Sequence, residues 1–145
     1  MLNKLLRTLV NITEGIRSLF LLLVIHVLAI TTSHKPKGQK SKILIVRLDA
    51  IGDFILWLDA AKAIRDRYPP ESYEITLLGN QAWTSLANEL PHFDRVWPFA
   101  RLKYLRNPLY AYTVLQRIYK ECFDIAINVT YSREFQFGDI IIKAS

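Results

Sequence analysis

The chain has 145 residues, a length that suits one domain, and its 51% hydrophobic residues are sufficient for a core. Its net charge is +6, but residues 1–42 carry seven basic residues against Glu14 alone, so the remainder is neutral and nucleic acid is not an expected partner. Cys122 is the only cysteine, which excludes an intrachain disulfide and a multi-cysteine metal site.

The first predicted segment, residues 1–33, is amphipathic and then hydrophobic. Apolar residues recur at helical spacing over 1–17, and residues 18–33 carry no charge. This pattern is typical of a helix that associates with a membrane surface. As a helix the uncharged stretch spans roughly 24 Å, less than the roughly 30 Å hydrocarbon core of a bilayer. A surface helix, a short transmembrane anchor, a signal-peptide hydrophobic region and a helix packed on the domain all remain open.

The second segment, residues 34–42, is predicted to be a flexible basic linker. It has four lysines and no apolar side chain beyond Pro36. These lysines either contact anionic lipid headgroups or stay solvated.

From residue 43 to residue 145 apolar strands alternate with helices, which predicts a Rossmann-like parallel α/β sheet. The buried positions expected on the first helix are Ile55, Leu58, Ala61, Ala63 and Ile64. The predicted strands are 43–48, 73–78, 95–99 and 123–129. The predicted helices are 54–68, 81–90, 104–122 with an interruption near its start at Asn107-Pro108, and one that begins near Gly138.

The turn Arg47-Leu48-Asp49-Ala50-Ile51-Gly52-Asp53 follows the apolar run of the first strand, and ligands of open α/β sheets bind at this place. Gly52 is expected to permit a tight bend there. The turn lacks the Gly-x-Gly-x-x-Gly fingerprint, and the chain has no Gly-x-x-x-x-Gly-Lys-Ser/Thr loop, so common nucleotide sites are excluded. The three histidines are too scattered to predict a metal site.

Two aspartates of this turn carry the chemistry that remains. Asp53 is either the cap of the helix that follows or a carboxylate that accepts a proton from a hydroxyl group in the cleft. Asp49 has three open interpretations: loop polarity, a partner for Arg47, or a ligand contact. The candidate site residues of this turn are therefore Asp53, Asp49, Gly52 and Arg47, with the role of each aspartate open at this point.

Six short motifs follow one another along the chain: Ile43 to Asp53, Arg67-Tyr68-Pro69, Ile75 to Gly79, Leu90-Pro91, Phe93 to Val96 and Phe123 to Asn128. Together they resemble glycosyltransferase family 9, the heptosyltransferases of lipopolysaccharide assembly. The resemblance covers about 42–129 and keeps the order and spacing of the family. Asp49 stands where a Ser or Thr is frequent, and Asp59 where the helix often has Pro.

The resemblance implies the N-terminal, acceptor-binding half of a GT-B enzyme that transfers a heptose or related sugar with inversion and without a metal or other cofactor. At the position of Asp53 the family has the base that deprotonates the acceptor hydroxyl. On this resemblance we predict Asp53 as the catalytic residue. The predicted substrate-binding residues are Gly52, Asp49 and Arg47, with no metal ligand. The nucleotide-sugar donor would be held by a C-terminal domain that this sequence lacks, so we expect the fragment to be inactive alone. Arg95, Arg101, Lys103 and Arg106 either contact acceptor phosphates or form a solvated face.

A membrane-facing segment at 1–33 suits an enzyme that acts on a lipid-linked glycan at the cytoplasmic face of the inner membrane. The alternative is a non-catalytic, membrane-associated α/β module that binds a glycan or a partner. A stand-alone flavodoxin-like nucleotide-binding domain would need a phosphate loop, and none is found.

Overall fold

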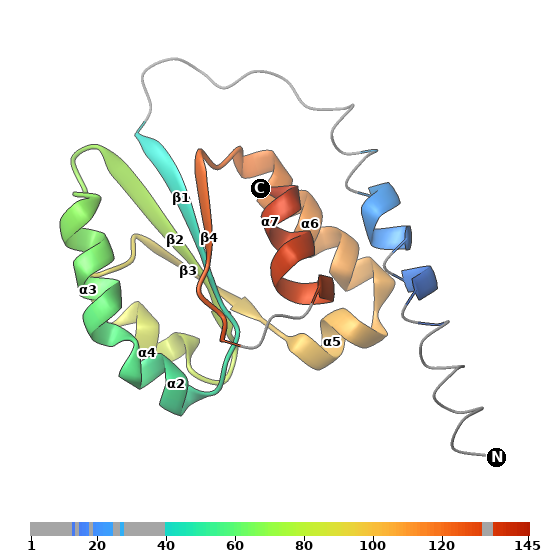
Figure 1. Ribbon diagram of the computed structural model, residues 1–145, viewed down its shortest axis with the longest axis horizontal. Helices are drawn as coiled ribbons and strands as arrows, with labels where there is room; N and C mark the ends of the chain where they lie inside the picture. Colours follow the sequence, from blue (N-terminus) through green and yellow to red (C-terminus); the bar gives the residue numbers. More distant parts are fainter. Residues whose placement is uncertain (1–12, 14, 18, 25–26, 28–39, 132–134) are drawn as a thin grey trace.

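The computed structural model describes residues 13, 15–17, 19–24, 27, 40–131 and 135–145, and within them lies one sheet of four parallel strands (Figure 1). The strand order is β3-β2-β1-β4, so the chain crosses back over the sheet after β3 to place β4 beside β1. The parallel α/β class predicted from the sequence is confirmed. The strands are β1 (Ser41–Arg47), β2 (Tyr73–Asn80), β3 (Arg95–Phe99) and β4 (Ile125–Asn128).

Helices cover both faces of this sheet. One face carries α2, α3 and α4, and the other carries α5, α6 and α7, with α7 beside α6 (Figure 1). The helices are α2 (Ile51–Leu56), α3 (Leu58–Arg67), α4 (Thr84–Asn88), α5 (Arg101–Arg106), α6 (Pro108–Glu121), the π-helix η1 (Phe135–Asp139) and α7 (Ile140–Ala144).

The central strand β1 contributes to a hydrophobic cluster on each face of the sheet. Its apolar residues are fully buried, and they point alternately to opposite faces because the side chains of a strand alternate. Leu44 and Val46 belong to the cluster beneath α5, α6 and α7. Ile43 and Ile45 belong to the cluster beneath α2, α3 and α4. This two-sided burial explains why β1 is a continuous apolar run.

The helix predicted over 54–68 is two helices that meet at Trp57. The first begins three residues earlier than predicted, at Ile51, and the break changes which side chains face the core. Phe54 is fully buried and stacks on Trp83 with 4.0 Å between ring centroids. Ile55 is 47% exposed and Ala63 is also exposed, so the prediction that these two are buried was wrong.

The helix predicted over 104–122 is divided at Asn107-Pro108, and the interruption predicted there is confirmed. α5 begins at Arg101 and ends before Asn107, whose side chain accepts a hydrogen bond from the Tyr110 N–H at 3.1 Å. Pro108 follows as the first residue of α6, a position where its missing N–H costs nothing. Cys122 has a left-handed backbone (φ 50°) and ends α6. β4 is therefore shorter than predicted, whereas β3 has the predicted bounds.

Part of the predicted membrane segment 1–33 packs on the domain. The described residues between 13 and 27 are helical, and Leu21 and Val24 join the cluster beneath α5, α6 and α7. Most of 1–33, and the predicted linker as far as residue 39, lie outside the described residues. The predicted linker ends too late, because Ser41 and Lys42 belong to β1.

Within the described part of the chain, no helix has both the length and the hydrophobicity that crossing a membrane requires.

A cavity at the carboxyl ends of the strands

A cavity of about 320 Å³ lies at the carboxyl ends of the strands, where the sequence predicted a ligand site. It adjoins β1 and β4, the neighbouring strands at which the chain reverses its direction across the sheet. In open α/β sheets such a reversal point leaves a crevice for ligands. The lining residues are Leu48, Asp49, Ala50, Asp53, Asn80, Arg101, Thr130 and Phe137.

Asp53 lines this cavity from the first turn of α2 and is exposed. The cap position of α2 is occupied by Ala50, and no side chain caps this helix. Among the described residues, none donates a hydrogen bond to the Asp53 carboxylate. The interpretation of Asp53 as the cap of this helix is therefore wrong, and Asp53 lines the cavity with a carboxylate that receives no hydrogen bond from these residues.

Arg47 lies beneath the turn and is not among the residues that line the cavity. It is 8% exposed and donates hydrogen bonds to the carbonyl oxygens of Asp53, at 2.9 Å, and of Val129. Its guanidinium also lies 5.6 Å from the ring centroid of Trp57. Arg47 thus joins the end of β1 to α2 and to the end of β4. This arrangement supports the turn and does not bring Arg47 to the cavity wall.

Asp49 lines the cavity, but its carboxylate is engaged within the protein. Oδ2 lies 3.3 Å from Nε of Arg47 and accepts a hydrogen bond from the Tyr131 N–H at 3.0 Å. The Asp49 carbonyl oxygen accepts from the indole Nε1–H of Trp83 at 2.9 Å. Of the three interpretations of Asp49, the partnership with Arg47 is confirmed.

Gly52 is the second residue of α2 and is exposed. Its backbone is outside the left-handed region, and a Cβ atom placed on it would meet nothing within 4 Å. The expected conformational role of Gly52 is therefore wrong, because the chain bends at Leu48 to Ala50, before the helix. Gly52 is not among the lining residues, although it directly precedes Asp53.

Two polar residues that the sequence analysis missed complete the cavity wall on either side of β1. Asn80 ends β2, and its amide nitrogen lies 3.4 Å from the carbonyl oxygen of Asp49. Thr130 follows β4, and its hydroxyl accepts from the Leu48 N–H at 3.2 Å. Asn80 is the last residue of its strand, and Thr130 follows the end of β4 by two residues. The rule that drew attention to Asp53 would therefore have found them had it been applied to every strand.

Arg101 and Phe137 form the far side of the cavity. Arg101 begins α5, and its guanidinium lies 4.7 Å from the ring centroid of Phe137. The cavity therefore combines two carboxylates with one guanidinium. Arg101 was noted in the sequence as one of four basic residues near the third strand, and the structure brings it to the same cavity as Asp53. Nothing in the sequence indicated Phe137.

Among the described residues, no three His, Cys, Asp or Glu side chains gather to hold a metal ion. No family model, curated protein or solved structure matches this chain.

Proposed function

We propose that this chain is the acceptor-binding half of an inverting glycosyltransferase related to the heptosyltransferases. In this proposal the cavity holds a lipopolysaccharide-type glycan, and Asp53 is the base that deprotonates its hydroxyl group. The support is the set of motifs around the turn together with the parallel sheet and the cavity at its reversal point. The assignment of this chain to the N-terminal half of a GT-B enzyme is part of this proposal.

The observation that carries the proposal is the difference between the two carboxylates of the cavity. The Asp49 side chain is 8% exposed and is bound to Arg47 and Tyr131. Asp53, four residues later, is exposed and receives no hydrogen bond from the described residues. A general base needs a lone pair that is free to meet the substrate proton. Asp53 meets this requirement with both carboxylate oxygens, whereas Oδ2 of the buried Asp49 side chain is held by Arg47 and Tyr131.

The proposed step is a single displacement. An acceptor hydroxyl gives its proton to the Asp53 carboxylate, and its oxygen forms a bond to the anomeric carbon of the donor sugar. The bond between that carbon and the nucleoside diphosphate breaks from the opposite side, and the configuration inverts. The negative charge leaves on the nucleotide, so the proposed step is balanced without a metal or another cofactor.

Two parts of the proposed enzyme rest on the sequence resemblance. The nucleotide-sugar donor would be bound by a second domain outside this sequence, and without it we expect no transfer. The acceptor-binding part of the cavity would be shaped by Gly52, Asp49 and Arg47. Of these, Asp49 and Arg47 would act by holding the turn in place through their ion pair and the hydrogen bond from Arg47 to the Asp53 carbonyl oxygen. Residues 1–33 would hold the enzyme at the cytoplasmic face of the inner membrane.

The test is sugar transfer by the protein that contains both this chain and the donor-binding domain. Asp53→Asn should lower turnover by about 10²–10⁴-fold, the usual contribution of a general base, with little change in KM for the acceptor. Asp59→Asn changes an exposed aspartate of the next helix in the same way and serves as the control. Near-normal turnover of Asp53→Asn would overturn the assignment of the base.

The alternative, a non-catalytic glycan-binding module, uses the same cavity. Saturation-transfer NMR of the present chain with a deacylated lipopolysaccharide oligosaccharide measures binding apart from transfer. Binding without transfer by the two-domain protein would favour the module. Absence of binding would count against both functions.

A further inference from the structure

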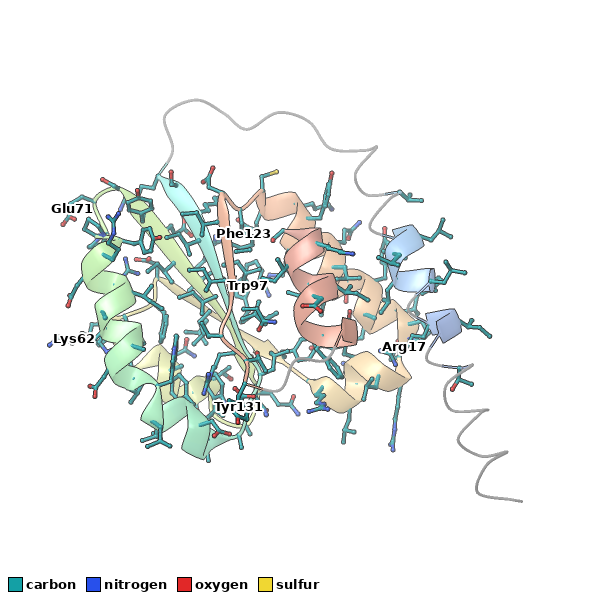
Figure 2. The ribbon with its side chains drawn as sticks, viewed as in Figure 1. Arg17, Lys62, Glu71, Trp97, Phe123 and Tyr131 are labelled. Carbon is teal, nitrogen blue, oxygen red and sulfur yellow. The ribbon has the colours of Figure 1, made fainter. Side chains whose placement is uncertain are left out.

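The described N-terminal residues are fixed to the domain at the junction of α5 and α6. Leu21 is 1% exposed and Val24 is 9% exposed, and both join the hydrophobic cluster that contains Leu115. The guanidinium of Arg17 donates to the carbonyl oxygens of Tyr104 and Leu105, the last turn of α5 (Figure 2). The N-terminal residues and these two helices therefore form one continuous surface.

The outer side of the N-terminal residues is an exposed apolar stripe. Its members are spaced by three or four residues, as on one face of a helix, and none of them is less than 43% exposed. Exposed apolar side chains that gather on one face in this way mark a docking surface. The stripe consists of Ile16, Leu19, Phe20, Leu23 and Val27.

The adjoining helices extend this surface with apolar and basic side chains. Leu102 on α5 is 65% exposed, and Leu109 at the start of α6 is 76% exposed. Lys103 and Arg106 are exposed beside them. A small cavity of about 50 Å³ is lined by residues of both parts, Phe20 among them, so the stripe and the α5–α6 junction are neighbours.

The positive charge of this surface indicates an anionic partner. The sequence contains no acidic residue between Asp94 and Glu121 and only Glu14 before Asp49. Exposed leucines among lysines and arginines, with few carboxylates nearby in the sequence, match the interface of an anionic bilayer. At such an interface apolar side chains enter the acyl boundary and basic ones meet the headgroups.

We propose that the apolar stripe and the α5–α6 junction together form one docking face that lies on an anionic phospholipid bilayer. The membrane contact is then made by the folded domain as well as by the N-terminal segment. Arg101 on the same α5 lines the cavity of Asp53, so docking brings that cavity beside the bilayer. Only this last consequence, access to a lipid-linked acceptor, rests on the proposed function.

The experiment is sedimentation of the full chain with phosphatidylcholine vesicles that either contain or lack phosphatidylglycerol. Deletion of residues 1–33 is unsuitable because it removes Leu21 and Val24 from the core. The double variant Lys103→Glu, Arg106→Glu should weaken binding to the anionic vesicles at least about tenfold, since each basic residue near such a surface contributes substantially. The matched control is Lys62→Glu, Arg67→Glu, two exposed residues of α3, the helix that lies on the other face of the sheet (Figure 1).

A second pair of variants tests the apolar contribution. Leu102→Ser, Leu109→Ser should also weaken binding, whereas Ile55→Ser, Leu56→Ser, which changes two exposed residues of α2, should not. Circular dichroism confirms that each variant is folded. Three results would each overturn the proposal. The first is an equal loss of vesicle binding by the α5 and α3 charge variants, and the second is wild-type vesicle binding by the leucine variant. The third is association with a second protein in place of vesicles. None of these measurements depends on sugar transfer, so the proposed function can fail while the docking face stands.

Discussion

The guanidinium of Arg47 donates a hydrogen bond to the main-chain carbonyl of Asp53 at 2.9 Å, from beneath the turn that presents the Asp53 carboxylate to the cavity. The same guanidinium donates to the carbonyl oxygen of Val129 and lies 3.3 Å from the carboxylate of Asp49. One buried side chain therefore sets the positions of both cavity aspartates. The position of the proposed base depends on a residue that the ligand never touches.

Replacement of Arg47 by methionine should destabilise the domain strongly. The variant leaves the Asp49 carboxylate buried without its cationic partner, and loss of one member of a buried pair costs about 3–5 kcal/mol. Urea unfolding measures the change, with Arg67→Met as the control, because Arg67 is exposed on α3 and its loss should alter stability by no more than about 0.5 kcal/mol. A cost below about 1 kcal/mol for Arg47→Met would show that the turn is held by other contacts.

Two glycines near the cavity should respond in opposite ways to alanine. Gly52→Ala should leave stability unchanged or raise it by up to about 1 kcal/mol, since the added Cβ meets open space inside a helix. Gly79→Ala should destabilise, because its Cβ would lie 2.6 Å from the ring of Trp83. Thermal unfolding of both variants makes the comparison. A loss of stability in Gly52→Ala would instead support the role predicted from the sequence, in which Gly52 permits a tight bend.

The sheet was predictable from the sequence because each strand is a short apolar run between turn residues, and β3 was placed at its observed bounds. The helix break at Trp57 was not predictable, because no proline or glycine marks it in the sequence and Phe54 beside it stacks on Trp83 from a distant part of the chain. For the same reason the exposure of Ile55 was missed.

The sequence predicted only those site residues that belong to one local segment, the strand β1 and the turn that follows it. Asp53 was found because local sequence places it after β1. Its isolation from structural hydrogen bonds depends on Arg47 and Asp49 pairing with each other and with residues after β4. Such pairings join segments about eighty residues apart, as between Arg47 and Val129, and no local pattern reveals them.

An ion-pair network near the amino-terminal end of the sheet should make the stability of the fold depend on pH in the acid range. Glu121 accepts hydrogen bonds from Arg95 at 3.0 Å and from Lys42 at 2.8 Å. Partial burial alone would raise the pKa of Glu121, but the hydrogen bonds and charges of Arg95 and Lys42 together lower it below its ordinary value of 4.5. The folded protein therefore holds the ionised form more strongly than the unfolded chain does.

The sign of the pH dependence follows from this lowered pKa. The stabilisation is fully present above the ordinary pKa of 4.5 and is lost as the pH falls through the lower folded value, because the unfolded state then binds the extra proton. The stability difference between wild type and Glu121→Gln should be constant at neutral pH and should shrink below about pH 4.5. Urea unfolding across this range measures it, with Glu71→Gln, an exposed glutamate, as the control. A difference that does not vary with pH would contradict the role given to the network.

The two aspartates of the cavity should separate stability from function. Asp49→Asn weakens the ion pair with Arg47 and perturbs the bond to the Tyr131 N–H, so it should cost about 1–3 kcal/mol in urea unfolding. Asp53→Asn removes no hydrogen bond made by the described residues and should change stability by no more than about 0.5 kcal/mol. In the two-domain protein Asp53→Asn should be the variant with the larger loss of sugar transfer, because it removes the proposed base. Asp49→Asn should retain turnover wherever it remains folded. Equal stability losses in the two variants would return Asp53 to a structural role, and equal turnover would remove its catalytic one.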